Sequence, residues 1–342
     1  MAYCWLECGS FIVPLPDKCQ YAWCALFNRQ KRTMWQTLRA TMKMHHLRDL
    51  LAVAEKGSIN AAAKYLGVSQ PALSRSVREL EKEMGAPLLE RQATGAALTP
   101  MGNLFVRRAS TAMNELRRAR DEIQQMQGSV HGTVVACISA MGHQTLLREA
   151  LATFTQRYPN VQLRVIEGVF PTIDARIRSG LVDFYVGPAP EAGTAPGLQL
   201  ETLFATKRVV LARKEHPLAQ ARSLAELTEA SWITTSITSQ AEKEFAGVFS
   251  GRGLKVPKLA LQTESALTWI TAILSTDMLV MMPELWLSSP LTKDLIVPIP
   301  IQETLAGAPM TLVRRSSVPS TPASEYFCDL LRRSASRLNV EA

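Results

Sequence analysis

The sequence predicts two folded parts, an all-helical N-terminal module and an α/β domain whose mixed sheets form two lobes. Apolar residues recur at helical spacing between Leu47 and Met126. Beyond Gly132, β-rich segments alternate with helical segments, which is the pattern of an α/β domain. The predicted strands there are 133–139, 162–167, 184–186, 208–212, 232–235 and 279–282. Because 47% of the 342 residues are hydrophobic, the chain can bury cores for two or three compact units.

Residues 1–43 precede the first amphipathic segment and show no sustained helical or strand period. We interpret them as an extension that is either a disordered arm or an artefact of the assigned start, with Met42 or Met44 as the true first residue. Four of the six cysteines lie here, namely Cys4, Cys8, Cys19 and Cys24. Their spacing matches no zinc pattern, so we expect reduced thiols, no metal and no other cofactor.

The first predicted helices follow each other closely. An apolar stripe from Leu47 to Ala54 stops at Gly57, and Ser58 is suited to cap an alanine-rich helix over 59–66. Only the three residues 67–69 separate this helix from the next, so the two form a helix-turn-helix unit.

The third predicted helix runs from Gln70 to about Met84, with Pro71 in its first turn, where a missing N–H costs little. It is amphipathic, because one side is apolar and the others are polar. The apolar positions are Leu73, Val77 and Leu80, and the polar ones include Ser74, Arg75 and Arg78.

A hairpin and a long helix complete the module. Residues 87–91 and 96–99 predict two short strands around a turn at Thr94 and Gly95, which together form a wing. Thr99 and Pro100 then open a helix that continues to about Gln127. Its apolar stripe comprises Leu104, Ala112, Leu116, Ile123 and Met126. Such a stripe outside a globular domain needs a partner, and the same helix of a second subunit is the best candidate.

Residues 61–81, AAAKYLGVSQPALSRSVRELE, resemble the helix-turn-helix of LysR-type transcriptional regulators. The resemblance continues through PLLER at 87–91, LTPMG at 98–102 and LVDF at 181–184, and it covers residues 44 to about 335. It implies a winged helix-turn-helix over 44–103, a linker and dimerisation helix over 100–127, and an effector-binding domain over 132–335.

That effector domain would consist of two Rossmann-like lobes with a ligand cleft between them, related in fold to periplasmic solute-binding proteins. Lobe I would comprise about 132–190 and 294–335, and lobe II about 191–293. We expect the proline-rich stretch at 187–190 to form a stiff crossover between the lobes.

The helix-turn-helix also supports DNA binding on physical grounds. A helix held across a three-residue turn can lie in a major groove about 12 Å wide and present its first side chains to base edges. Gln can pair with adenine and Arg with guanine, while a hydroxyl at a helix N-terminus suits a phosphate. The predicted DNA-binding residues are Ser69, Gln70, Pro71, Ser74, Arg75 and Arg78 on the helix, with Arg91 and Thr94 on the wing. A plain three-helix packing module with solvated polar faces is the alternative.

The resemblance implies that cleft residues lie where strands turn into helices. The candidates are Ser139, Met141, Phe170, Thr234, Thr235, Thr263, Ser265 and Met282. Hydroxyls at helix starts suit an anion, because free amides and a positive dipole end lie there, although each could equally be a plain N-cap. We expect an organic acid, aromatic acids included, bound by hydroxyls and helix N-termini rather than by a buried salt bridge. The segment ahead of Pro283 also departs from the family. Members commonly have small residues there, glycine included, whereas residues 275–283 contain three methionines.

The charge of the chain is unevenly distributed. Residues 1–43 carry six Lys/Arg against two Asp/Glu, residues 44–127 twelve against nine, and residues 128–342 twenty against nineteen. The basic excess in the N-terminal third suits nucleic-acid contact there. No run approaches the ~20 apolar residues of a membrane span, and no secretory signal is visible. We therefore expect a cytoplasmic protein without a membrane partner.

An enzyme and a solute-binding transport protein are the rival classes. The sequence contains no Gly-x-Ser-x-Gly elbow, no P-loop and no Gly-x-Gly-x-x-Gly, and it has only five histidines, so no catalytic machinery is visible. The fused helix-turn-helix argues against a transport protein. We predict a transcriptional regulator rather than an enzyme. We expect it to form a homodimer that assembles to a homotetramer, and to bind a double-stranded operator with dyad symmetry. RNA polymerase is a further candidate partner.

Overall fold

The protein is represented by a computed structural model that describes residues 42–92, 95–127, 131–190, 193, 195–236, 239–316 and 318–341. The predicted N-terminal extension lies outside these residues except for its last two positions, and so do the four cysteines within it. The described chain divides into two compact units, one ending at Ser110 and one beginning at Thr111.

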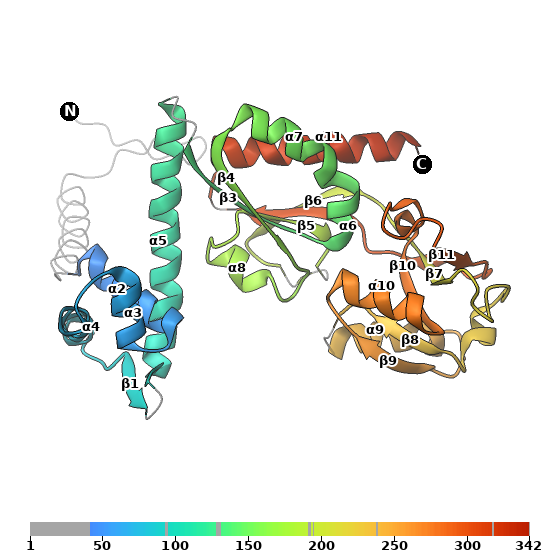
Figure 1. Ribbon diagram of the computed structural model, residues 1–342, viewed down its shortest axis with the longest axis horizontal. Helices are drawn as coiled ribbons and strands as arrows, with labels where there is room; N and C mark the ends of the chain where they lie inside the picture. The colour runs from blue at the N-terminus through green and yellow to red at the C-terminus, as the bar shows by residue number, and fades with distance from the viewer. Residues whose placement is uncertain are drawn as a thin grey trace, which may run out of the picture. The chain divides into compact units, whose positions relative to one another are not determined.

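Helices α2 (Met44–Lys56), α3 (Ile59–Leu66) and α4 (Gln70–Met84) form the core of the first unit (Figure 1). Their predicted apolar faces pack together, and Leu50, Val53, Leu73, Val77 and Leu80 are all buried. Serine caps start two of these helices as predicted. Ser58 Oγ accepts the Ala61 N–H at 3.1 Å, and Ser69 Oγ accepts the Ala72 N–H at 3.4 Å.

Strands β1 (Leu89–Gln92) and β2 (Gly95–Leu98) pair antiparallel and form the predicted wing. Helix α5 (Pro100–Met126) follows directly, and Thr99 fixes its start. Thr99 Oγ1 accepts the Gly102 N–H at 2.9 Å and donates to the Pro87 carbonyl at 2.8 Å. A Cβ on Gly102 would lie 2.0 Å from the Leu88 carbonyl oxygen, so only glycine fits this close approach. The 98–102 motif therefore locks the wing to the helix.

Lobe I of the second unit is a five-stranded sheet in the order β4-β3-β5-β13-β6. Two buried clusters, one on each face, show that the sheet is covered on both sides. Helices α7 (Arg148–Arg157) and α11 (Pro322–Glu341) pack on one face, and α8 (Asp174–Arg178) packs on the other (Figure 1). The strands are β3 (His131–Ile138), β4 (Asn160–Glu167), β5 (Phe184–Pro188), β6 (Leu198–Phe204) and β13 (Met310–Arg315).

Lobe II is built on a second sheet in the order β11-β7-β10-β8-β9, with the short β12 (Leu305–Ala306) also paired to β7. Helices α9 (Ser239–Ser250) and α10 (Ala266–Ser275) pack against it. Its other strands are β7 (Lys207–Arg213), β8 (Ser231–Thr234), β9 (Lys258–Gln262), β10 (Met278–Pro283) and β11 (Ile296–Ile299). Both sheets mix parallel and antiparallel neighbours, as predicted.

The predicted lobe boundaries are wrong at both ends. Residues 198–204, expected in lobe II, form β6 and pair with β13 of lobe I, whereas 296–306, expected in lobe I, form β11 and β12 on β7 of lobe II. The proline-rich stretch is no crossover, because Gly187 and Pro188 end β5 opposite Thr311 and Met310. The chain instead changes lobes at 205–206 and again at 307–309, where Thr206 Oγ1 donates to the Ala308 carbonyl at 2.8 Å.

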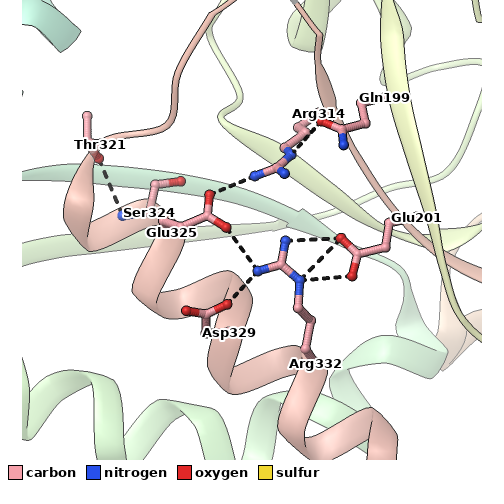
Figure 2. Close-up of polar contacts among 8 residues, drawn as sticks. All are labelled: Gln199, Glu201, Arg314, Thr321, Ser324, Glu325, Asp329 and Arg332. Carbon is pink, nitrogen blue, oxygen red and sulfur yellow. Dashed lines mark hydrogen bonds and ion pairs between the residues drawn. The ribbon is translucent and has the colours of Figure 1, made fainter.

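An ionic network fastens α11 to β6, in addition to the pairing of this strand with β13 (Figure 2). Arg332 Nε and Nη2 donate to the Glu201 carboxylate on β6 at 2.9–3.2 Å, and Nη1 reaches Glu325 at 2.9 Å. Arg314 on β13 binds the other oxygen of Glu325 at 2.6 Å. Hydrogen bonds to Glu201 and Glu325 raise the pKa of Arg332 further above its ordinary value. The pairing thus ties two distant chain segments to one lobe.

Candidate functional sites

The N-terminal half of α4 presents the predicted DNA-binding residues on one exposed face. Gln70, Ser74 and Arg78 follow one another at four-residue spacing, with Pro71 and Arg75 beside them on the same side. All are exposed except Ser74, which is half-buried, and Ser69 at the N-cap is exposed as well. The opposite side of the helix is the buried stripe of the first unit.

Hydrogen bonds organise this face. Gln70 Nε2 donates to Ser74 Oγ at 3.1 Å, and Arg78 Nε donates to the Ser74 carbonyl at 3.1 Å. Arg75 has no hydrogen-bond or ion-pair partner within the part of the chain that the structure describes. Its guanidinium is therefore free to make the paired donor contacts that guanine accepts.

The wing residues are less fully described. Arg91 stands in β1 opposite Ala96, and its side chain lies outside what the structure describes. Thr94 is also outside the described residues. Glu81 Oε1 accepts the N–H groups of Leu88 and Leu89 at 2.8 and 3.0 Å, so the start of the hairpin is held on α4.

The effector domain contains a cavity of about 430 Å³ that both lobes line. Its volume lies within the range of small-molecule sites. Six predicted residues line it, namely Ser139, Met141, Phe170, Thr234, Thr235 and Met282. Ser139 Oγ also caps α6 (Ala140–Gly142) by accepting the Gly142 N–H at 3.3 Å, whereas Thr235 makes no side-chain bond with the described residues.

Thr263 and Ser265, also predicted for the cleft, do not line the cavity. Thr263 Oγ1 accepts the Ser265 N–H at 3.0 Å, and Ser265 Oγ accepts the Thr268 N–H at 3.3 Å. Both hydroxyls are thus occupied in starting α10, which is the plain capping role. Glu264, between them, does line the cavity.

Charged cavity residues were absent from the sequence prediction. Arg208 on β7 lines the cavity together with Glu167, Glu244 and Glu264. Arg208 Nε donates to the Ala306 carbonyl at 2.7 Å. Burial lowers the pKa of Arg208 from its ordinary value, and the nearby charge of Glu244 opposes that shift. The available sequence signal was a cation directly ahead of an apolar run, 209–212.

Aromatic side chains form much of the cavity wall. Phe170 and Tyr185 meet edge to face at 5.1 Å, and Trp269 and Trp286 do so at 4.8 Å. Trp286 is fully buried, and its Nε1 has no hydrogen-bond partner among the described residues. The wall suits an organic ligand with an apolar or planar part.

The second half of α5 is bound to lobe I by polar contacts. Arg118 pairs with Asp183, and Arg315 on β13 pairs with Glu115. Asn114 Nδ2 donates to the Ser179 carbonyl at 3.0 Å. Asp183, Arg118 and Arg315 are buried, so these contacts hold the helix as part of the second unit.

A winged helix-turn-helix, a long helix and a two-lobed α/β domain with a cavity together define a DNA-binding transcriptional regulator with an effector-binding domain. Residues 44–103 match the family model described as a bacterial regulatory helix-turn-helix protein of the lysR family, and residues 127–336 match the LysR substrate binding domain. The chain belongs to the LysR family of transcriptional regulators and is not an enzyme. Residues 1–43 lie outside both matches.

Curated relatives that match over most of this chain support this assignment. The chain is 26% identical to the HTH-type transcriptional regulator TdcA of Escherichia coli (strain K12) over 294 residues, 86% of this chain and 94% of that protein. It is 26% identical to the HTH-type transcriptional regulator GalR of Pseudomonas putida over 84% of this chain and 72% of that one. These are relatives within the family.

Solved structures show the same fold. The LysR family regulator CbnR matches with a TM-score of 0.63 at 21% identity, over 86% of this chain and 99% of that one. Full-length CbnR complexed with its target DNA matches with a TM-score of 0.62 at 22% identity, over 86% of this chain and 100% of that one.

Within the described residues, every helix is too short or too polar to cross a bilayer.

Proposed function

We propose that this chain regulates transcription from an operator of dyad symmetry in response to a small organic acid, aromatic acids included, that binds between the lobes. The observation that supports the proposal is the cavity of about 430 Å³, which brings hydroxyls of both lobes together with Arg208. An acid there could accept charge-assisted hydrogen bonds, which are stronger than neutral ones. The protein would act in the cytoplasm, where its DNA is.

DNA recognition would fall to the exposed face of α4. Arg75 and Gln70 would read bases in the major groove, and Ser69 with the helix N-terminus would bind phosphate. Ser74, Arg78 and Pro71 flank them on the same face, and the wing with Arg91 and Thr94 would contact the adjacent backbone. The complex of CbnR with its target DNA supports this assignment by analogy of fold.

The ligand would act by selecting one arrangement of the two lobes. A ligand shifts such an equilibrium only by its difference in affinity for the two arrangements. Because α5 starts at the wing and its second half is bound to lobe I, a new arrangement could alter the spacing of the half-sites. RNA polymerase would be the partner that responds to that spacing.

Dimerisation would use the apolar stripe of α5. In a single chain, Leu104, Leu116, Ile123 and Met126 are between 52% and 76% exposed. Together with Ala112 they lie along one side of the helix, and 112, 116, 123 and 126 follow one another at the four-, seven- and three-residue steps of a coiled-coil seam. We propose that a second copy covers this stripe and that effector domains then join dimers into a homotetramer.

Gel shifts with genomic fragments, including the region upstream of the neighbouring divergently transcribed gene, test the proposal. We expect salt-sensitive, specific binding that organic acids shift. A Ser139→Ala, Thr235→Ala double variant should lose most of that response, whereas a Thr153→Ala, Thr228→Ala control, which removes two hydroxyls outside the cavity, should keep it. If acids shift the first variant as they shift wild type, the proposed acid site is wrong.

A further inference from the structure

Two polar atoms of opposite character are unsatisfied at the cavity. Trp286 is fully buried, and among the described residues its Nε1–H has no acceptor and the buried Glu264 Oε1 has no donor. Both residues line the cavity. Because a buried polar atom without a partner is costly, such atoms at a cavity indicate what a ligand would supply. A ligand that satisfied both atoms would carry an acceptor and a donor.

The charges lining the cavity lead to the same requirement. Arg208 is the one cation among its described lining residues, against the three carboxylates Glu167, Glu244 and Glu264. Glu167 and Glu244 are exposed, so solvent screens them. Glu264 is half-buried, and water compensates its charge less well. A ligand that carried only a carboxylate would leave Glu264 unpaired and add a further negative charge nearby.

We propose, on the basis of the proposed function, that the effector is a zwitterion of the amino-acid type rather than a simple carboxylic acid. Its carboxylate would be bound by Arg208 and by the Nε1–H of Trp286, and its ammonium group by Glu264. The aromatic faces of Trp269 and Trp286 would add attraction for the ammonium group.

The test uses the full-length chain and matched probes. The twenty proteinogenic amino acids are screened by thermal shift, and the tightest is compared by calorimetry with its deamino acid and with its decarboxylated amine. We expect both analogues to bind at least tenfold more weakly than the amino acid, because each satisfies only one end of the site.

Two variants identify the residue that reads the ammonium group. Glu264→Gln should weaken binding of the amino acid at least tenfold and leave the affinity for the deamino acid unchanged. Glu284→Gln is the matched control, because Glu284 is exposed and does not line the cavity, and it should bind like wild type. A melting curve like that of wild type shows that each variant is folded.

The contrary outcomes separate this inference from the function on which it rests. If deamino or other organic acids bind as tightly as any amino acid, and Glu264→Gln has no effect, the zwitterion is wrong and the organic-acid effector stands. If the amine binds as tightly as the amino acid, the acid-binding function is wrong. If neither amino acids nor organic acids bind a chain that still binds its operator, both proposals are wrong.

Discussion

Asp183 connects two elements of the effector domain through its two carboxylate oxygens. Oδ1 pairs with Arg118 Nη2 on α5, and Oδ2 accepts the backbone N–H of Val135 on β3 at 2.6 Å. Asp183 and Arg118 are 9% and 8% exposed. Burial raises the pKa of Asp183 and lowers the pKa of Arg118, and each charge opposes the shift of the other. The 181–184 motif thus has a structural reason.

Asp183→Asn should destabilise the effector domain by about 3–5 kcal/mol, because it leaves the Arg118 guanidinium buried without its counter-charge. Urea unfolding measures this loss. Asp174→Asn is the matched control, since it breaks a surface i,i+4 pair with Arg178 and should cost about 0.5 kcal/mol or less. Equal stability of the two variants would show that the buried pair has no such role.

Arg75→Ala should weaken specific operator binding by about 1–3 kcal/mol and change non-specific binding much less, because a base contact carries discrimination. Anisotropy titrations with operator and random DNA measure both affinities. Lys64→Ala, which removes an exposed cation from α3, serves as the control for general electrostatic loss. If Arg75→Ala weakens all sequences equally, Arg75 contacts phosphate instead.

Leu116→Asp should yield monomers that lose most operator affinity. The substitution places a charge in the proposed α5 seam, and each half-site would then bind without the effective concentration that a second module supplies. Leu267→Asp is the matched control, because Leu267 on α10 is 73% exposed against 52% for Leu116. An intact dimer of Leu116→Asp in analytical sedimentation would refute the seam.

Alkaline pH should destabilise the protein partly through Cys137. Burial raises the pKa of this thiol from 9.0 to about 12, so the unfolded chain loses the proton first as pH rises. The stability that Cys137 contributes is complete below the unfolded pKa and falls by about 1.4 kcal/mol between about pH 8 and pH 10. Urea unfolding gives the free energies of unfolding of wild type and Cys137→Ala. We expect the difference between them to fall by about 1.4 kcal/mol from about pH 8 to pH 10. A constant difference would contradict the buried neutral thiol.

Local patterns predicted many elements of the fold. The strands expected at 133–139, 162–167, 184–186, 208–212, 232–235 and 279–282 are confirmed in β3, β4, β5, β7, β8 and β10, with bounds shifted by a few residues. Each is a short apolar run between turn residues, and such a run can be recognised from the local sequence alone. The assignment of strands to lobes was not predictable in this way, because β6 pairs with β13, more than a hundred residues away.

The site residues likewise differ in whether a local sequence pattern could identify them. The α4 face follows from the period of one helix, so Gln70, Ser74 and Arg75 could be placed together from sequence. Ser139 and Thr235 were also found, because hydroxyls at strand ends are a local signal. Arg208, Glu264 and Trp286 were missed, since they lie far apart in the sequence and only the tertiary fold of lobe II brings them to one cavity.

The proposed coupling between effector and operator binding is tested most directly by an anisotropy titration of the full-length protein on an operator fragment, with and without the acid that stabilises it most. We predict specific binding that weakens steeply with salt, and an operator affinity that the acid changes in wild type but not in the Ser139→Ala, Thr235→Ala variant. Binding without preference for the operator, or an affinity that no acid alters, would contradict it.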